Sequence, residues 1–119
     1  MRRVVITGAG TVNALARDVP GTLVAFREGR CGIGPLDLPD PERLQIRIGA
    51  QVRDWQPETL FPGNRLPLYD RFAQFALIAG AEAMAGAGLC VDEALAHRAG
   101  AILGSAGGGL TTSDAAYRE

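Results

Sequence analysis

The sequence contains no lysine, and all 12 of its basic residues are arginine. This excludes a Schiff base between the protein and a carbonyl substrate, and a P-loop, whose lysine contacts a nucleotide phosphate. His97 is the sole histidine, which excludes a multi-histidine metal site. The two cysteines, Cys31 and Cys90, lie far apart without CxxC spacing, which excludes a zinc cage. They could form one disulfide, but two free thiols are the expectation for a reducing cytosol.

Long apolar runs are also missing. No segment has the ~20 apolar residues that a membrane-spanning helix needs. The run beginning at Val4 ends at Thr7-Gly8, too early for a secretory signal. The arginines are scattered without interleaved aromatic residues, a pattern that argues against nucleic-acid binding. With 47% hydrophobic and 21% charged residues and a net charge of −1, the composition is that of an ordinary globular protein, and a cytoplasmic location is expected.

Three segments are predicted to be strands. Residues 3–7 and 100–105 are continuous apolar runs, typical of strands buried on both faces. Residues 45–52 alternate between apolar and polar, which predicts a half-buried or edge strand. Glycine and proline predict a loop over residues 31–43 and an extended surface connection over residues 54–67.

Helices are predicted between these strands. Asp18 caps a first helix, which carries Pro20 in its first turn and stops at Gly29. Asp70 caps a long helix that ends at Gly88 in a Schellman motif. One face of that helix carries an apolar stripe of Phe72, Phe75, Ala76, Ala79 and Ala83. Its alanines, with Gly80, keep the helix thin, so neighbouring segments can approach closely.

A short helix over residues 91–98 and a last helix beginning near Ser113, capped by Thr111 or Thr112, complete the set. The order strand, helix, strand, helix, helix, strand, helix predicts an α/β layered fold.

Two glycine motifs could carry function. The first, Gly8-Ala9-Gly10, follows a predicted strand as in dinucleotide-binding folds. Asn13 occupies the third glycine position, however, and Glu28 lies in a predicted helix where a ribose-binding acid should end a strand. A small nucleotide-binding domain therefore stays as an alternative. The second, residues 107–109, requires positive φ or a close neighbour. It is either a tight strand-to-helix turn or a backbone wall against a ligand or a partner subunit.

The reactive side chains present do not form a catalytic group. Cys31 and Cys90 lack a neighbouring cation or helix N-terminus that would activate a thiol. His97, beside Arg98, is expected to face solvent. The pair Asp70-Arg71 is either a charge pair or a helix cap followed by an ordinary arginine, and its apolar neighbours favour burial of the arginine.

Taken together, these segments resemble the N-terminal part of an elongating β-ketoacyl-(acyl-carrier-protein) synthase. The resemblance is carried by motifs in the family's order over nearly the whole chain. They are the opening strand and turn at residues 2–10, the G-x-S/C-G-I loop at 29–35, the D-R-x-x-Q/Y-x-A helix start at 70–76, and the G-S-x-x-G-G strand end within 100–110.

The resemblance implies a thiolase-like layered α-β-α-β-α fold, of which residues 1–119 form an incomplete N-terminal domain. It implies an acyltransferase of fatty-acid or polyketide synthesis that catalyses a decarboxylative Claisen condensation. The partner is an acyl carrier protein, the full-length enzyme is a homodimer, and no metal or organic cofactor is implied. The family's nucleophilic cysteine and two histidines match no residue here, so this segment alone is expected to be inactive.

Two departures from the family pattern bear on function. The family's T-P-L-G after the first turn is replaced by residues 12–16, Val-Asn-Ala-Leu-Ala. Gly107 stands where many members carry a bulky apolar residue that lines the acyl tunnel, so Gly107 and Gly108 are the candidate acyl-pocket or dimer-contact residues. The departures leave open a non-catalytic partner subunit that determines chain length.

Overall fold

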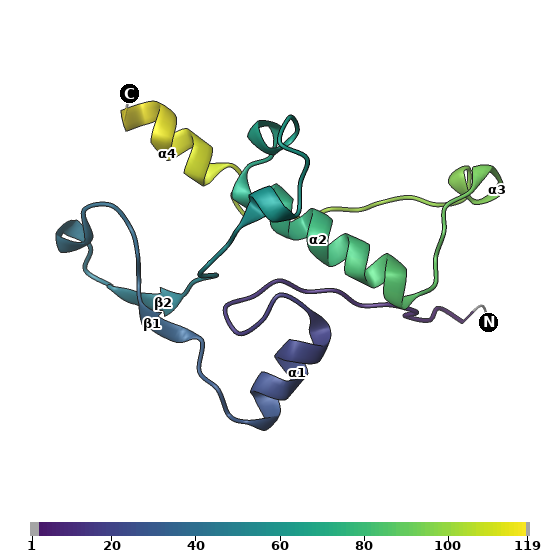
Figure 1. Ribbon diagram of the computed structural model, residues 1–119, viewed down its shortest axis with the longest axis horizontal. Coiled ribbons are helices and arrows are strands. Elements are labelled where there is room, and N and C mark those ends of the chain that lie inside the picture. The colour runs from purple at the N-terminus through teal and green to yellow at the C-terminus, as the bar shows by residue number, and fades with distance from the viewer. Residues whose placement is uncertain (1–2, 119) are drawn as a thin grey trace.

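The computed structural model describes residues 3–118, and its elements alternate between short helices, one small sheet and long connections (Figure 1). The α-helices are α1 (Val19–Arg27), α2 (Arg71–Gly86), α3 (Glu93–Ala96) and α4 (Leu110–Arg118). The strands are β1 (Ile33–Pro35) and β2 (Ile48–Ala50), and the 3-10 turns are η1 (Pro41–Arg43), η2 (Pro57–Thr59) and η3 (Leu66–Leu68). The chain is thus mixed α/β, as predicted, although the described residues do not form stacked layers.

Helix α2 is the longest element, and its two ends form as the sequence predicts. At its start, a carboxylate oxygen of Asp70 accepts the backbone N–H of Phe72 at 3.3 Å. At its end, Gly88 has φ 61°, and the N–H of Leu89 reaches back to the carbonyl of Met84 at 2.9 Å. That bond closes a Schellman motif, because it satisfies a carbonyl that the last turn leaves open.

The predicted signals also set the bounds of α1. Asp18 accepts the N–H of Gly21 at 2.7 Å, and proline lies in the first turn. Gly29 follows the helix with φ 65°, the left-handed conformation that favours glycine.

The N-terminal segment packs directly on the backbone of α2. A Cβ added to Gly8 would overlap the carbonyl oxygen of Ala83 and lie 2.9 Å from the nitrogen of Ala87. A Cβ added to Gly10 would overlap the carbonyl oxygen of Ala79. The predicted close approach is therefore confirmed at the alanines. At Gly80 nothing lies within 4 Å of a Cβ, so that glycine plays no part in it.

A carboxylate of α2 secures the same segment. Glu82 accepts the N–H of Thr11 at 2.9 Å through one oxygen and the N–H of Val19 at 2.7 Å through the other. Val19 is the first residue of α1, and the N–H groups of a helix's first turn have no partner within that helix. One side chain of α2 therefore holds both the N-terminal segment and the start of α1.

Asn13 builds the turn between this segment and α1. Its side-chain oxygen accepts the N–H of Leu15 at 2.8 Å and of Ala16 at 3.1 Å, and its amide donates to the Thr22 hydroxyl at 2.9 Å. These bonds make an Asx-type turn. Asn13, one of the residues 12–16 that depart from the expected T-P-L-G, therefore has a structural role in this turn.

The sheet is a hairpin, and it corrects the prediction that residues 31–43 are all loop. Strand β1 pairs with β2 antiparallel, with Gly34 opposite Gly49. Glycine and proline indicated a loop, but they occupy a two-stranded sheet whose edges lack neighbours, where proline is tolerated. The predicted strand at 45–52 is confirmed in its centre, Ile48–Ala50.

Two predicted strands are absent from the described chain. Residues 3–7 and 100–105 are coil, drawn as plain tubes in Figure 1. They are exposed rather than buried: Ile6 is 93% and Ile102 102% exposed. The apolar, β-branched composition favours strands, but a strand needs a neighbour for its N–H and C=O groups, and no such neighbour occurs within residues 3–118.

Smaller differences concern the connections. The prediction of an extended segment over residues 54–67 misses the turns η2 and η3, in which Pro57 and Pro67 stand first and second, respectively. The helix predicted over 91–98 is confined to Glu93–Ala96. Helix α4 begins at Leu110 rather than near Ser113, which places Thr112 inside its first turn instead of at its cap.

The described elements enclose little interior. The accessible surface is 9811 Å², whereas a compact monomer of this mass exposes about 6,200 Å². The radius of gyration is 17.4 Å, against roughly 13.5 Å for a compact domain of this length. Ala25 is the one apolar residue of the described chain that is fully buried. Apolar side chains that normally form a core therefore remain open to solvent here.

The packing of Gly10 on α2 yields a first prediction. Gly10→Ala should lower the free energy of unfolding of the full-length protein by about 1–3 kcal/mol or more, because its methyl group would overlap the Ala79 carbonyl. Gly80→Ala is the matched control. Its methyl group would meet nothing within 4 Å, and it should stabilise α2 by about 0.5–1 kcal/mol. Chemical denaturation measures both, and equal effects would contradict the close approach.

Candidate functional site: the glycine loop at the start of α4

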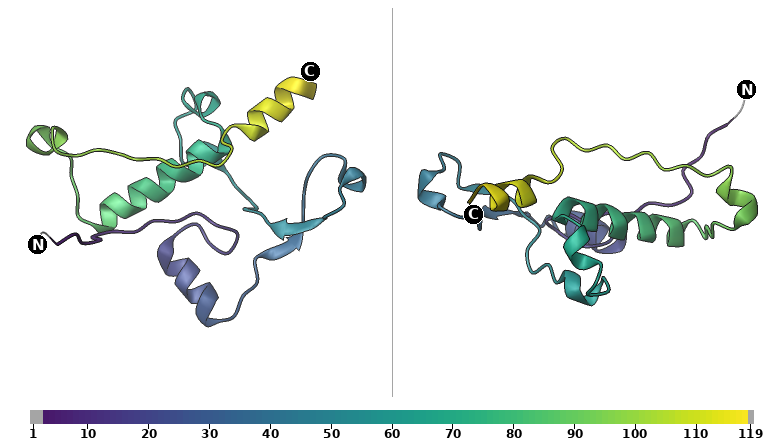
Figure 2. Two further views of the ribbon diagram at one scale, coloured as in Figure 1. Left: turned by 180° about the vertical axis from the view of Figure 1, so that it is seen from behind. Right: turned by 90° about the horizontal axis from the view of Figure 1, so that it is seen from above.

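The glycine loop, residues 107–109, joins the coil at 100–105 to α4 and lies at the start of α2. Both views of Figure 2 show α4 projecting from this end of α2, while the N-terminal segment from residue 3 onward begins towards the other end. Gly109 has φ 83°, a conformation that strains any side-chain-bearing residue. The predicted requirement for positive φ is therefore confirmed at Gly109.

Gly108 meets the other predicted requirement, a close neighbour. A Cβ at Gly108 would lie 2.6 Å from Cζ of Phe72 and 2.8 Å from Oγ of Ser105. Gly107 differs, because a Cβ there would meet only Leu110, at an ordinary 3.5 Å. A Cβ at Gly108 would therefore force the Phe72 ring and the Ser105 hydroxyl to move, whereas Gly107 has room for a Cβ.

Asp70 fixes the loop from the opposite side. One carboxylate oxygen of Asp70 caps α2. Its second carboxylate oxygen accepts the N–H of Thr112 at 3.0 Å and the hydroxyl of the same residue. Thr112 lies in the first turn of α4, where N–H groups lack partners within the helix. One carboxylate therefore serves the N-termini of both helices.

These bonds change the acidity of Asp70. The Thr112 hydroxyl holds the pKa of this carboxyl below its usual 3.8, and the backbone N–H groups of Thr112, Phe72 and Arg71 act in the same direction. Desolvation opposes them only in part. The charged form of Asp70 is therefore the form that this geometry favours.

The first turn of α2 is anchored on its other flank. Gln74, which is buried, accepts the indole N–H of Trp55 at 2.7 Å and donates to the Tyr69 carbonyl at 2.8 Å. Trp55 also packs edge-on against Phe75, with ring centroids 4.8 Å apart. Because Phe72 and Asp70 belong to this turn, the contacts hold both residues in place.

Arg71 contributes to this anchor rather than to a charge pair. Its guanidinium donates to the Val52 carbonyl and lies 5.5 Å from the centroid of the Phe75 ring. No ion pair joins it to Asp70 among the described residues, so the cap interpretation of Asp70 is confirmed. Arg71 is half-buried, less than the sequence predicts.

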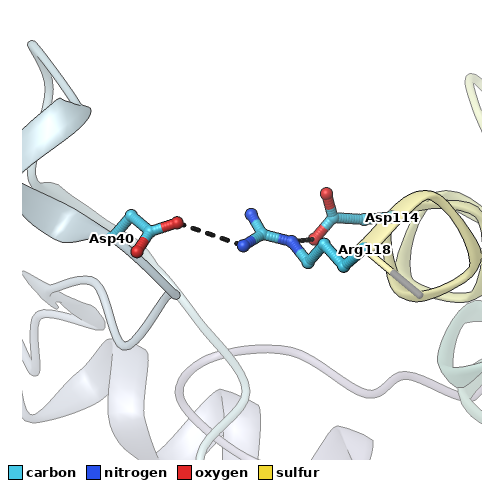
Figure 3. Close-up of polar contacts among 3 residues, drawn as sticks. All are labelled: Asp40, Asp114 and Arg118. Carbon is cyan, nitrogen blue, oxygen red and sulfur yellow. Dashed lines mark hydrogen bonds and ion pairs between the residues drawn. The ribbon is translucent and has the colours of Figure 1, made fainter.

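An ion pair attaches the far end of α4 to the hairpin (Figure 3). Arg118 contacts Asp40 at 3.1 Å and Asp114, one turn earlier, at 2.9 Å. Asp40 and then Asp114 raise the pKa of Arg118. All three side chains are about half exposed, so the pair adds little stability. An open, apolar groove of about 450 Å³ lies beside Arg118, between α4 and the segment around Leu38 and Pro39.

The remaining candidate residues lie away from the loop. Cys31 and Cys90 are exposed free thiols, which confirms that expectation over a disulfide. His97 is exposed after α3, also as expected. Within residues 3–118, no three side chains of metal-ligating type gather.

The first glycine motif serves packing. The backbone of Gly8 and Gly10 lies against backbone carbonyls along α2, rather than at a helix N-terminus as a pyrophosphate-binding turn does. None of the helices between residues 3 and 118 is both long and apolar enough to cross a membrane.

The contacts between Asp70 and Thr112 and between Phe72 and Gly108 were not predicted. Asp70 carried a signal as a cap, and Thr112 as a residue near a helix start. Nothing in the spacing of 42 positions indicated that they share a hydrogen bond.

Comparisons with known proteins decide what this arrangement belongs to. Residues 1–119 match the family model described as "Beta-ketoacyl synthase, N-terminal domain". The chain belongs to the beta-ketoacyl synthase family. It corresponds to the N-terminal part of these proteins, as the sequence motifs predicted.

Curated relatives within this family carry two kinds of name. Nodulation protein E of Rhizobium sp. (strain N33) is 42% identical over 117 residues, which are 98% of this chain and 29% of the relative. The 3-oxoacyl-[acyl-carrier-protein] synthase 2 of Coxiella burnetii is 35% identical over 109 residues, covering 92% of this chain and 26% of the relative. The synthase of the same name from Staphylococcus aureus (strain COL) is 30% identical over 118 residues, covering 99% and 28%. The chain thus spans less than a third of the length of these relatives.

The lowered pKa of Asp70 gives the second prediction. Because folding lowers this pKa, the stability it contributes is present above about pH 4 and is lost as the pH falls through the folded-state value. Asp70→Asn removes the titration and keeps a good α2 cap. In the full-length protein, the stability advantage of the native aspartate over the Asp70→Asn variant should therefore begin to shrink near pH 4 and continue to shrink as the pH falls through the folded-state pKa, which lies below 3.8. Urea titrations at each pH measure it, and a constant difference would contradict the bonding of the charged form.

Proposed function

We propose that this chain is the N-terminal segment of a 3-oxoacyl-[acyl-carrier-protein] synthase, an acyltransferase of fatty-acid or polyketide synthesis. Relatives that align over 92% or more of the chain carry this name. The observation that carries the proposal is the glycine loop: a backbone wall at Gly107 and Gly108, both exposed, with Gly108 held against the Phe72 ring.

The reaction joins two thioesters. A cysteine thiolate attacks the acyl thioester of an acyl carrier protein, the acyl group becomes bonded to the cysteine, and the carrier thiol leaves. A malonyl thioester then loses carbon dioxide, and the resulting enolate carbon attacks the acyl carbonyl. The new carbon–carbon bond forms as the cysteine thiolate leaves, and donors placed around the carbonyl oxygen stabilise its developing charge.

This segment supplies a pocket wall, and other parts of a longer protein supply the reacting groups. Cys31, Cys90 and His97 lie outside the glycine loop and match none of the family's catalytic positions. We assign the nucleophilic cysteine and the two histidines to polypeptide beyond these residues. The segment alone is therefore expected to have no condensing activity.

The exposed apolar segments fit the same proposal. Residues 3–7 and 100–105 have strand composition without strand partners, and the accessible surface far exceeds that of a compact domain. In a thiolase-like layered fold, further strands of the longer protein would pair with them and cover their side chains. We further propose a homodimer in the cytoplasm that works with an acyl carrier protein and needs no cofactor.

Condensation by the full-length protein is the direct test and the third prediction. Purified protein given an acylated carrier protein and a malonylated carrier protein should release carbon dioxide and form the 3-oxoacyl product, which mass spectrometry of the carrier detects. Residues 1–119 given the same substrates should form none. A full-length protein without a reactive cysteine and without product would favour a non-catalytic, chain-length-determining subunit. Product formation by the segment alone would contradict the assignment of the nucleophile.

Gly107 gives the fourth prediction, on acyl length. A Cβ at this position would lie at an ordinary contact distance from Leu110, so Gly107→Ile is expected to fold and to fill space that a long acyl chain would use. The ratio of kcat/KM for long over short acyl groups should fall by roughly tenfold or more. Gly63→Ile, on a surface loop where a Cβ meets nothing within 4 Å, should leave the ratio unchanged. An unchanged profile in Gly107→Ile would remove Gly107 from the acyl pocket.

A further inference from the structure

We infer that Asp70 and Thr112 are positioning residues for the glycine loop: their hydrogen bonds hold Gly108 against Phe72 and so set the wall of the acyl pocket. This role in acyl selectivity rests on the proposed function, whereas the mechanical coupling rests on the geometry alone.

The first step is the attachment of the loop at its end. Between Gly108 and Thr112 the chain turns through Gly109, whose positive φ favours glycine. Beyond this turn, the N–H and hydroxyl of Thr112 both bond one carboxylate oxygen of Asp70. Two bonds to a single charged acceptor fix the start of α4 more firmly than a neutral cap would.

The second step is the contact that the attachment enforces. Gly108 approaches the Phe72 ring so closely that a Cβ would lie 2.6 Å from Cζ and 2.7 Å from Cε2. Phe72 lies two residues after Asp70, in the same helical turn, and donates its own N–H to the first carboxylate oxygen at 3.3 Å. The turn that anchors α4 therefore also carries the surface on which the loop rests.

The third step is what the loop would do without this attachment. The segment before it, residues 100–105, is exposed coil, and no side chain of Gly107 or Gly108 anchors the loop by its own packing. Within the described chain, the Asp70–Thr112 bonds and the Phe72 contact are what holds the loop to α2. Weakening the bonds should make residues 107–109 more mobile, so that the acyl pocket becomes wider and less well defined.

Thr112→Val tests the coupling, because it removes the hydroxyl while conserving shape and the backbone N–H. In the full-length protein, amide hydrogen exchange at residues 107–113 should accelerate about three- to tenfold, the range expected for one net hydrogen bond. The kcat/KM preference between long and short acyl thioesters should narrow, with kcat for the preferred substrate little changed. Thr112→Ser retains the hydroxyl and should match the native protein in both measurements.

Asp92→Ala is the matched control for a lost helix cap. Asp92 caps α3 through the N–H of Leu95 at 2.8 Å, away from the loop. Its removal should speed exchange around residues 92–98 and leave the loop and the acyl preference unchanged. If it altered the loop as Thr112→Val does, the effect would be general destabilisation and the inference would fail.

The outcomes separate this inference from the proposed function. Unchanged exchange in the loop of Thr112→Val overturns the positioning role, even in an active synthase. Faster exchange with an unchanged acyl preference overturns its link to selectivity. A native protein that forms no condensation product defeats the proposed function, and the exchange data then still decide whether Asp70 and Thr112 fix the loop.

Discussion

Close approach of bare backbone to α2 is the constraint on which the rest of the structure depends. Near its C-terminal half, Gly8 and Gly10 bring the N-terminal segment onto the carbonyls of Ala79 and Ala83. At its first turn, Gly108 lies against the ring of Phe72, a side chain rather than backbone. A methyl group at Gly8 or Gly10 would separate the segments, because it would overlap helix carbonyls, which cannot turn aside as a side chain can. Helix α2 therefore determines where both glycine motifs lie.

Two carboxylates, Glu82 within α2 and Asp70 at its N-cap, add directional hydrogen bonds to this packing. Glu82 accepts the first N–H of α1, and Asp70 accepts an N–H in the first turn of α4. The start of a helix carries unpaired N–H groups and partial positive charge, which a carboxylate from another helix can neutralise. Each bond links residues more than 40 positions apart, 63 for Val19–Glu82 and 42 for Asp70–Thr112. The long helix thus orients the starts of two others.

Local signals predicted the elements that local physics determines. The caps at Asp18 and Asp70 and the left-handed stops at Gly29 and Gly88 lie within a few residues of the bonds they satisfy, and the structure confirms them. The glycine loop was predicted for the same reason. The bonds of Glu82 and Asp70 to other helices were missed, because they depend on tertiary placement that no spacing in the sequence encodes.

The two wrong strand predictions also arise because the local sequence does not show tertiary neighbours. Composition at residues 3–7 and 100–105 reports the environment for which those side chains are suited, a buried sheet. Strand pairing, however, is a property of at least two segments, and the described chain pairs only β1 with β2. A continuous apolar run therefore indicates that the segment is suited to burial. It indicates less about the conformation of the segment when no neighbour buries it.

This distinction matters for the glycine loop, because residues 100–105 lead directly into it. On the side of α4 the loop is fixed by Asp70 and rests on Phe72. On the other side, Ser105 ends a coil whose Ile102 and Leu103 are exposed. A neighbouring strand that covered these side chains would fix Ser105, and with it the entry of the loop. The position of Gly107 would then be determined from both ends, by a carboxylate of α2 on one side and by sheet pairing on the other.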